Sequence, residues 1–424
     1  MNNSSFRKAM LRMQLTAACE IFPGSPEYRK YAKSFMPIDI SLGHEPDTID
    51  AMRWCPGKED NGFFLILGAS GSGKTEALKL IGNQLVEHAI PVLVLDFHGD
   101  VIFPGLSSVM MSSGFGSTVG VNPMELDSQQ AHDVGLYDQR MALVEMISRV
   151  IPDISHNQKV TLTEAIACAY QHAGIFDDDP RTWWNPPPTF ATVLELLEAW
   201  ADDENMKSRR PTIRGCIAVV KSIFGHPIFR RDCSLSVDEI LSAGARVDLS
   251  KVPDGIRYIA ADTLLRKIFR ALLLKGPIPV SPVDDLERFR LFIMIDEAKI
   301  LSAATGHPND SRLILNLLIT EGRKFGIGLI MASQMSEHFG AEVKASVATR
   351  LVLKPMDSNQ AKKNAPDMQV SPQDLLDLKG RGSGFFKPRS GQGTQRIQVD
   401  KFTDHSKPAP EPDEWEPYVG VGGI

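Results

Sequence analysis

The octapeptide GASGSGKT, residues 68–75, constrains the fold more than any other part of the sequence. It directly follows the apolar run FFLIL (63–67) and precedes a helical pattern over 74–88. The spacing fits the motif GxxxxGK[ST], whose glycines let backbone N–H groups converge on phosphate oxygens at a helix N-terminus. A buried strand, a tight loop and a helix in this order predict an α/β unit with a phosphate-binding loop.

The chemistry of this loop predicts ATP and Mg²⁺ as its ligands. We expect the Lys74 side chain to reach the β- and γ-phosphates, and the Thr75 hydroxyl to bind the magnesium ion. A glycine- and serine-rich turn without a ligand is the alternative, and the strand–loop–helix setting argues against it. The expected nucleotide-binding residues are Ser70, Gly71, Ser72, Gly73, Lys74, Thr75 and Glu76.

Further apolar runs predict a mostly parallel sheet. Continuous apolar strands are typical of sheets that are covered on both faces, and helical patterns at 258–275 and 311–322 lie between several of these runs. Strands that alternate with helices favour an α/β fold. The expected strands are 63–67, 92–96, 245–249, 291–295, 327–332 and 350–353, followed by a hairpin over 380–388 and 394–400.

The composition changes along the chain and predicts four parts. Residues 1–60 form a short N-terminal region, and residues 61–125 and 244–400 form the α/β core. Residues 126–243 lack strand-like runs and carry helical periodicity, so we interpret them as a helical insertion. Residues 401–424 are acidic and proline-rich, which indicates an extended tail.

The global numbers exclude several classes of protein. A net charge of −6 gives no overall attraction to nucleic acid, so a polyanionic partner would need a local patch. The five cysteines are scattered without a CxxC or Cys/His cluster, which favours a reducing compartment and no zinc site. The apolar runs have the length of strands and fall short of the roughly 20 residues that span a bilayer. We therefore expect a cytoplasmic protein without membrane insertion.

A pair of acids ends the fourth of these strands. In LFIMIDEAK (291–299), Asp296 and Glu297 follow the apolar run directly, at the strand end where α/β sheets bind ligands. Asp296 suits the magnesium shell, and Glu297 suits the polarisation of a water that attacks the γ-phosphate. A solvated strand end is the alternative. An adjacent base for water argues against a small-molecule kinase.

The stretch EGRKFGIGLIMASQ (321–334) has polar groups at both ends of a buried strand. If this strand runs parallel to 63–67, its carboxyl end brings Gln334 to the phosphate edge, where it could orient the attacking water. Arg323 lies at the other end, about 20 Å away. It is therefore either a surface cation or an arginine finger that acts on the ATP of a neighbouring subunit.

The ordered set of motifs resembles the HerA/FtsK superfamily of P-loop ATPases, and most closely its HerA-like branch. The resemblance covers about residues 60–400, although the region before the P-loop is shorter than the β-barrel domain that HerA carries. The motifs are GASGSGKT, VLDFHGD (94–100), VNPM (121–124), ARVDLS (245–250), LFIMIDEAK and EGRKFGIGLIMASQ.

This resemblance implies a RecA-like core with an inserted helical subdomain, assembled as a homo-oligomeric, usually hexameric ring that pumps double-stranded DNA. By motif match, Lys74, Thr75, Asp296, Glu297 and Gln334 take the nucleotide roles given above, and Arg323 takes the intersubunit role. His98 and Asp100 fall in a strand-end motif near the phosphates, unless DFHGD is only a capped turn.

Two segments are candidates for contact with DNA. Residues 207–231 contain seven lysines and arginines and no acid, unless these charges form a solvated helix face or pair with the acidic DDEN upstream. The loop over 302–312 is a candidate for the lining of a pore. The tail could cross to an adjacent subunit, as in HerA-like rings.

The sequence thus predicts an ATP-driven DNA translocase or helicase. A nuclease or a restriction or antiviral defence partner would be a separate protein, since no nuclease cluster of acids with Lys or His is visible. Two alternatives remain. One is a conjugation- or secretion-type ATPase that powers the assembly of a membrane complex, and the other is a nucleotide-gated binding module.

Overall fold

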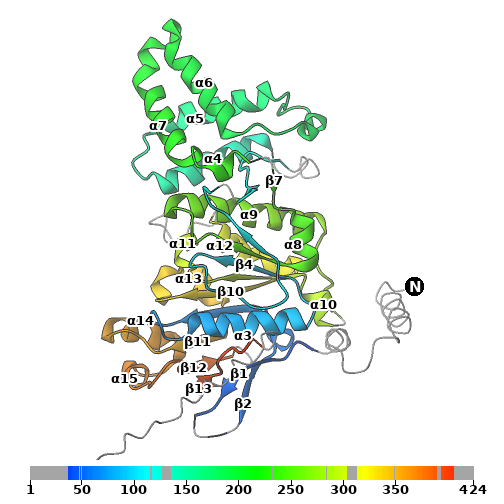
Figure 1. Ribbon diagram of the computed structural model, residues 1–424, viewed down its shortest axis with the longest axis vertical. Helices are drawn as coiled ribbons and strands as arrows, with labels where there is room; N and C mark the ends of the chain where they lie inside the picture. The colour runs from blue at the N-terminus through cyan, green and yellow to red at the C-terminus, as the bar shows by residue number, and fades with distance from the viewer. Residues whose placement is uncertain are drawn as a thin grey trace, which may run out of the picture.

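The computed structural model describes residues 37–404, apart from 47, 49, 115–116, 127–134, 232, 283, 303–312, 348 and 389–392. Its main feature is an 11-stranded mixed sheet with the strand order β2-β1-β13-β12-β11-β3-β10-β9-β4-β8-β5. Figure 1 shows this sheet across the middle and lower part of the molecule, with helices on both faces. The candidate pore-lining loop and most of the expected tail fall outside the described residues.

In this order, the seven strands from β11 to β5 run parallel to one another. This confirms the predicted α/β fold with a mostly parallel sheet. The expected strands are all present, with bounds that differ by one residue at most. These strands are β3 (Phe63–Leu67), β4 (Val92–Asp96), β8 (Ala245–Asp248), β9 (Leu291–Ile295), β10 (Ile327–Ser333) and β11 (Thr349–Leu353). The edge strand β5 (Ser108–Met110) was not predicted.

The other four strands extend the sheet in antiparallel order. Strands β12 (Ser383–Lys387) and β13 (Gln395–Val399) form the expected hairpin. Strands β1 (Ile40–His44) and β2 (Ala51–Trp54) come from the N-terminal region and join the same sheet beside β13. The sequence analysis assigned no strand to this region.

Alternate residues of the central strands face opposite layers. Leu65 and Leu67 of β3 pack into the cluster that includes helix α9, while Phe64 and Ile66 pack into the cluster around helix α3. This alternation follows from the two-residue period of a strand, and both faces are apolar because helices cover both. The two layers leave the carboxyl ends of the parallel strands free to carry polar groups.

Helices of the core cover the two faces and connect the strands. In the described part of the chain, no helix is long and apolar enough to cross a lipid bilayer. The helices of the core are α3 (Lys74–Glu87), α8 (Val237–Ala243), α9 (Asp254–Leu274), α10 (Asp285–Arg288), α11 (Lys299–Ser302), α12 (Ile314–Glu321), α13 (Ala341–Ser346), α14 (Ser358–Met368) and α15 (Pro372–Leu376).

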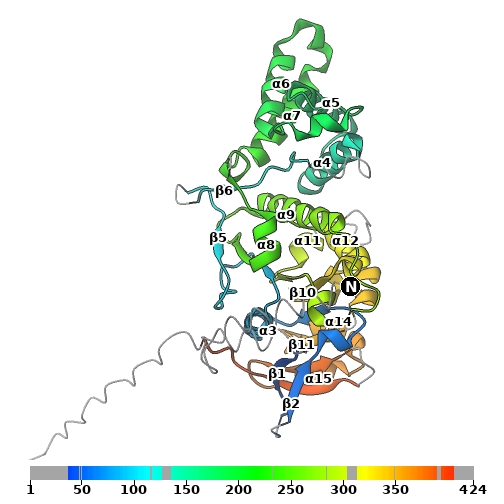
Figure 2. The ribbon, with the colours of Figure 1, turned by 90° about the vertical axis from the view of Figure 1, so that its right-hand side faces the viewer.

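Helices α4 to α7 form a layer of their own beyond α9, which we call the helical lobe (Figures 1 and 2). The chain leaves the core after β6 (Val119–Gly120) and returns through β7 (Cys233–Ser234), which pairs with β6. The boundaries predicted at residues 60, 125, 243 and 400 stay a prediction. The lobe consists of α4 (Leu136–Val150), α5 (His156–His172), α6 (Phe190–Asp202) and α7 (Arg210–Phe224).

Candidate nucleotide site at the carboxyl edge of the sheet

The loop between β3 and α3 has the backbone that a phosphate-binding loop requires. Gly71 and Gly73 have φ angles of 76° and 113°, in the region where a side chain is strained. Neighbouring strand ends fix the loop, since Gly68 N–H donates to Ser333 O, and Gly382 N–H donates to Ser72 O at 2.8 Å. The N-terminus of α3 therefore faces the carboxyl edge of the sheet, where its dipole attracts anions.

Lys74 lies folded over this loop. Its ammonium group donates to the carbonyls of Gly68 at 2.9 Å and Ala69 at 2.8 Å. Burial lowers the pKa of Lys74, and the nearby Glu297 carboxylate opposes that shift. An ammonium group that loop carbonyls hold so close to the helix N-terminus can turn to a phosphate without a change in the backbone.

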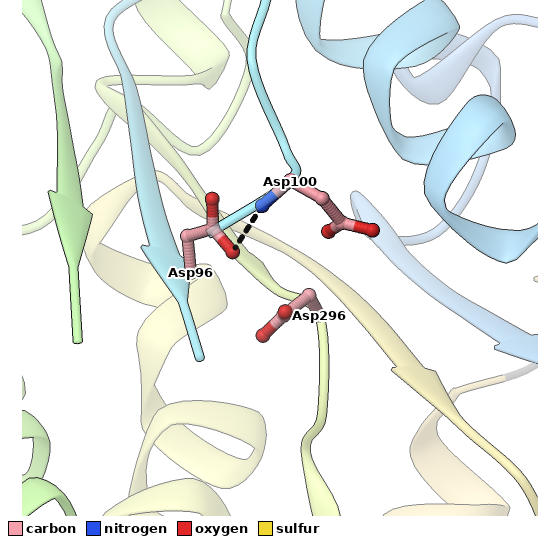
Figure 3. Close-up of side chains that lie close together, drawn as sticks. All are labelled: Asp96, Asp100 and Asp296. Atoms are coloured by element: carbon pink, nitrogen blue, oxygen red, sulfur yellow. Dashed lines mark hydrogen bonds between the residues drawn. The ribbon is translucent and has the colours of Figure 1, made fainter. Parts of the chain in front are cut away.

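Asp96, at the end of β4, organises the loop that follows it. Its Oδ1 accepts hydrogen bonds from the backbone N–H groups of His98, Gly99 and Asp100, and the contact with Asp100 is drawn in Figure 3. Its Oδ2 accepts from Val101 N–H at 2.9 Å and from Arg246 Nε at 2.8 Å. Both oxygens of this fully buried carboxylate are thus committed to protein donors, so Asp96 has a structural role.

The pair of Asp96 and Arg246 is expected to contribute strongly to stability. Asp96 is 0% and Arg246 is 7% exposed, and the guanidinium also contacts Asp248 at 3.1 Å. Arg246→Met would leave two buried carboxylates without their cation. We expect the free energy of unfolding to fall by about 3–5 kcal/mol. Urea denaturation, with Arg53→Met on the exposed Asp39 pair as the control, measures this difference. A loss as small as that of the control would contradict it.

Two other carboxylates are placed to hold a metal ion. Oxygens of Asp96, Asp100 and Asp296 lie within 4.8 Å of one another, and these side chains converge from β4, the loop after it and β9 (Figure 3). Thr75 Oγ1 donates to Asp100 Oδ2 at 3.4 Å, so the hydroxyl of the phosphate-binding loop joins this group. Since both oxygens of Asp96 already accept hydrogen bonds, Thr75, Asp100 and Asp296 are the residues of this group whose oxygen atoms could serve Mg²⁺, which prefers oxygen ligands.

Hydrogen bonds from the loop after β4 orient Asp296. Phe97 N–H donates to Oδ1 at 3.0 Å, and His98 contacts Oδ2 through its N–H at 3.2 Å and its Nδ1 at 2.8 Å. Burial raises the pKa of Asp296, and the hydrogen bond to Asp296 raises the pKa of His98. His98 is thus held by Asp296, and 56% of its side chain is exposed.

Glu297 is buried beside this group. Only 5% of the residue is exposed, and its Oε1 has no hydrogen-bond partner among the described residues. The nearest cation is Lys299, whose Nζ lies 3.6 Å from Oε1. A buried carboxylate oxygen without a donor is costly unless a ligand or a water completes it. This orphan oxygen, and the equally buried and unpartnered Ser72 Oγ, fit a site that is completed by a bound group.

Gln334 follows the carboxyl end of β10 at the same edge. Strand β10 pairs in parallel with β3 and β9, with Ser333 opposite Leu67, so Gln334 lies next to the start of the phosphate-binding loop. Asn364 Nδ2 donates to Gln334 O at 3.3 Å, and Asn364 Oδ1 accepts from Ser336 N–H. These contacts fix the backbone of Gln334 and leave its carboxamide to act on a ligand.

Arg323 lies at the opposite end of the same strand. It is an exposed residue of the short 3₁₀ helix Gly322–Phe325, which precedes β10. The adjacent Lys324 pairs with Glu321 at 2.7 Å, whereas Arg323 makes no ion pair in the described ranges. The sheet therefore brings the other predicted site residues to one edge and leaves Arg323 at the far edge of the same subunit.

A family model described as the central domain of helicase HerA matches residues 63–268. The match runs from β3 through the phosphate-binding loop and the Asp96 loop into α9, and so contains half of the site described above. Over this central part, the chain is similar to the HerA-like P-loop ATPases of the HerA/FtsK superfamily. This confirms the resemblance that the ordered motifs indicated.

Relatives in the superfamily share limited identity with the chain. It is 23% identical over 358 residues to the DNA double-strand break repair helicase HerA of Pyrococcus furiosus, over 76% of this chain and 61% of that protein. It is 24% identical over 306 residues to the DNA import protein CedB of Sulfolobus acidocaldarius, over 71% of this chain and 45% of that protein. The chain thus spans between about half and two thirds of the length of these relatives.

Solved structures of the superfamily share the fold. VirB4 of Thermoanaerobacter pseudethanolicus superposes with a TM-score of 0.62 at 19% identity, over 86% of this chain and 96% of that chain. The plasmid coupling protein TrwB, in complex with ADP and Mg²⁺, gives a TM-score of 0.59 at 14% identity over 92% and 95%. These likenesses confirm a RecA-like core.

A pocket of about 470 Å³ opens beside the P-loop, a volume typical of small-molecule sites. Gly73 and Glu76 form its P-loop side, and the start of β12 and the end of β13 form the other. Glu76 contacts Lys79 at 3.7 Å and Arg381 at 3.6 Å. Among the residues expected to bind nucleotide, Gly73 and Glu76 thus line this pocket, whereas Ser70 and Gly71 are exposed. The remaining lining residues are His44, Gly382, Gln398, Val399, Asp400 and Lys401.

The basic segment 207–231 is largely neutralised within the described part of the protein. Arg209 pairs with Glu164, Arg210 with Glu204 of the acidic DDEN, and Lys221 with Glu198. Arg231 donates to backbone carbonyls of the 112–119 segment. The exposed Lys207, Arg214 and Arg230 make no ion pair with described residues. Only this smaller set remains available to an external polyanion.

Three residues that shape the site carried no firm prediction. Asp96 and Arg246 are in contact because β4 and β8 are neighbouring strands. The two residues are far apart in the sequence, so the sequence does not reveal this contact. Asp100 fell in the DFHGD motif, but only the fold brings it to Thr75. The signal for both acids was the strand end itself: Asp96 ends β4, and Asp100 follows Gly99, whose φ of 84° favours a glycine in the turn.

Proposed function

We propose that this chain hydrolyses ATP to move along double-stranded DNA as a ring of identical subunits. The observation that carries the proposal is the separation of two groups. Glu297, whose Oε1 has no hydrogen-bond partner among the described residues, lies buried at the P-loop edge. The exposed Arg323, which makes no ion pair within the described ranges, lies at the far edge. In one subunit the base for water and Arg323 thus lie at opposite edges of the sheet, and a second copy would bring its own Arg323 to the site.

ATP fits the P-loop edge through residues of this chain. Lys74 and the first N–H groups of α3 would bind the β- and γ-phosphates, and the pocket bordered by Gly73 and Arg381 has room for the nucleoside. Mg²⁺ would be held by Thr75 and Asp296, with Asp100 beside them, and when bound it would neutralise charge on the phosphates. TrwB, which shares the fold, was solved with ADP and Mg²⁺.

Hydrolysis would use Glu297 and Gln334. The Glu297 carboxylate would accept a proton from the water that attacks the γ-phosphate, and the Gln334 carboxamide would orient that water. The low exposure of Glu297 excludes bulk water and keeps its free oxygen available to one ordered molecule. His98, held against Asp296, would face the phosphates from the metal side.

Arg323 would complete the site of the adjacent subunit. An arginine finger from a neighbour stabilises the charge that develops on the transferred phosphoryl group, and it makes hydrolysis depend on assembly. An arginine that acts on the next subunit requires a head-to-tail interface, and such an interface gives a closed ring when its rotation closes. We propose a hexamer in the cytoplasm.

DNA as the polymer follows from the relatives, which are named for DNA break repair and DNA import. Lys207, Arg214 and Arg230 of the helical lobe are candidate contacts to its phosphates. Cleavage of DNA would belong to a separate nuclease or defence partner. The alternative is an ATPase that powers the assembly of a membrane complex, and it is kept because the chain shares its fold with TrwB, which is named a bacterial conjugative coupling protein.

The rate of ATP hydrolysis, measured against protein concentration with and without linear duplex DNA, tests this proposal. We expect the rate per subunit to rise with concentration as subunits assemble, in parallel with the mass measured by light scattering. We also expect duplex DNA to increase it about 10-fold, as binding energy drives closure of the site. A rate that ignores DNA but rises with membrane partners would favour the alternative. Nucleotide-dependent assembly with little turnover would indicate a nucleotide-gated binding module.

A further inference from the structure

Helix α9 begins beside the loop that orients Asp296, and Arg257 in its first turn contacts that loop. Arg257 Nη1 donates to Phe97 O at 3.2 Å, and its guanidinium carbon lies 5.9 Å from the centre of the Phe97 ring. Phe97 is 1% exposed, and 19% of the Arg257 side chain is exposed. The contact therefore reaches a buried carbonyl from the partly open end of the helix.

The carbonyl that Arg257 holds belongs to the same peptide unit as the N–H of His98. A peptide unit is planar, so its C=O and N–H point in opposite directions. In this unit the N–H donates to Asp296 Oδ2 at 3.2 Å, while the C=O accepts from Arg257. Rotation of the unit would turn a carbonyl oxygen toward the carboxylate and remove one of its donors. A cation on the carbonyl opposes that rotation and strengthens the N–H as a donor.

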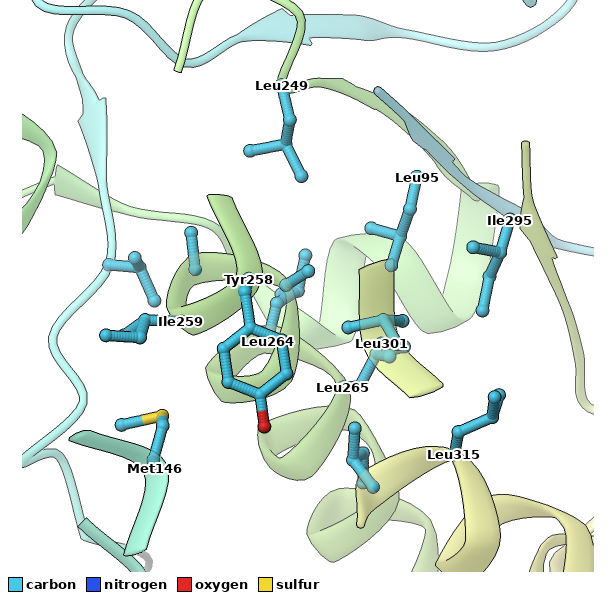
Figure 4. Packing of buried hydrophobic residues seen from close by; sticks show 14 of the residues in the cluster. Leu95, Met146, Leu249, Tyr258, Ile259, Leu264, Leu265, Ile295, Leu301 and Leu315 are labelled. Atoms are coloured by element: carbon cyan, nitrogen blue, oxygen red, sulfur yellow. The ribbon is translucent and has the colours of Figure 1, made fainter. Parts of the chain in front are cut away.

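The backbone of helix α9 at Arg257 is held in place by the packing of the next residue. The next residue, Tyr258, is 2% exposed, and its hydroxyl accepts a hydrogen bond from Arg149 Nη1 of α4 at 3.3 Å. Figure 4 shows Tyr258 packed among the apolar side chains of α9, with Met146 of α4 on one side. The second partner of Arg257 is Asp254, whose side chain is 88% exposed and exerts little restraint.

We propose that Arg257 is a positioning residue that sets the metal-binding carboxylate Asp296 by holding the Phe97–His98 peptide. The proposal rests on the function proposed above, because it takes Asp296 as a ligand of Mg²⁺. Residues that orient a metal ligand change metal affinity by about 10- to 100-fold when they are removed. Loss of Arg257 should therefore weaken the response to Mg²⁺ and leave the metal-free affinity for nucleotide intact.

The test compares variants by two readouts. One is the Mg²⁺ concentration that gives half-maximal ATP hydrolysis, and the other is the affinity for fluorescent ADP in EDTA and in Mg²⁺. In Arg257→Met, which keeps the stem over Phe97, we expect the half-maximal concentration to rise about 10-fold. ADP affinity should be unchanged in EDTA and should gain less from Mg²⁺ than in the wild type. Arg257→Lys retains a cationic donor, so its half-maximal Mg²⁺ concentration and its ADP affinity in Mg²⁺ should stay close to those of the wild type.

Two further variants give the experiment its controls. Asp254→Asn removes the exposed partner of Arg257 and should behave as the wild type in both readouts. Asp296→Asn should shift the Mg²⁺ response at least as far as Arg257→Met. If Asp296→Asn shifts it and Arg257→Met does not, the positioning role is wrong while the proposed function stands. If neither shifts it, the metal role of Asp296 is wrong as well. Should Arg257→Met fail to fold, Arg257→Gln gives the same comparison.

Discussion

Glu297→Gln is expected to bind ATP with nearly wild-type affinity and to hydrolyse it about 10²- to 10⁴-fold more slowly. The substitution keeps the size of a side chain that is 5% exposed, so the fold should be preserved. It replaces the free carboxylate oxygen, which can accept a proton from water, with an amide that cannot. The P-loop contacts to the phosphates do not depend on this group.

Steady-state hydrolysis and equilibrium binding of a fluorescent ATP analogue measure the two effects separately. Glu337→Gln is a suitable control, because this glutamate lies near the same edge but pairs with Lys363 at 2.6 Å. The control should hydrolyse ATP at close to the wild-type rate. If Glu297→Gln retained more than about a tenth of the rate, the general base would have to be another group, and Asp100 would be the first candidate.

Arg323→Ala is expected to bind ATP normally and to lose on the order of 10³-fold in the hydrolysis rate of the assembled protein. The reason is geometric. A strand of seven residues separates Arg323 from the P-loop edge of its own subunit, a distance of about 20 Å that no arginine side chain spans. Its loss should therefore leave binding by the same subunit intact and remove charge stabilisation from the neighbouring site.

The adjacent lysine supplies the matched control. Lys324→Ala removes an exposed cation from the same turn, but that cation is already paired with Glu321. We expect the hydrolysis rate of Lys324→Ala to remain within about twofold of the wild type, as for a surface ion pair. If both variants lost activity equally, the effect would reflect the local fold or general charge. If neither did, Arg323 would be an ordinary surface residue.

The P-loop half of the site could be predicted because it is contiguous. GASGSGKT follows the FFLIL strand without interruption, so the strand, the loop and the helix were all present in one stretch of sequence. The parallel alignment of β10 with β3 then placed Gln334 at the same edge as Lys74, as the buried run at 327–332 had predicted. Short-range patterns and the parallel-sheet rule were sufficient for these residues.

The side chains that orient the acids could not be predicted from the sequence, because their positions depend on long-range contacts. Arg246 serves Asp96 only because β8 lies next to β4, and Arg257 reaches Phe97 only because α9 begins beneath the same loop. The strands β1 and β2 were missed for a related reason. The short run ISLGH of β1 is stabilised by pairing with β13, which lies about 350 residues further along the chain, and AMRW of β2 pairs in turn with β1.

The basic segment shows how charge patterns mislead when the partners are distant. Seven cations without an acid between residues 207 and 231 favoured a nucleic-acid surface. Glu164 and Glu198 come from α5 and α6, however, and these helices pack against the segment and neutralise Arg209 and Lys221. A linear count of charges cannot reveal this compensation, which leaves three exposed cations to be tested by salt-dependent DNA binding.

The most direct measurement mixes Glu297→Gln with Arg323→Ala subunits and records ATP hydrolysis across the range of ratios. In a mixed ring, the intact Glu297 of one variant can meet the intact Arg323 of the other across a shared boundary. Two nearly inactive proteins should therefore regain activity together, with a maximum near equal amounts. A mixture that stays as inactive as its components at every ratio, although mass measurements show co-assembly, would contradict a site completed by the neighbouring subunit.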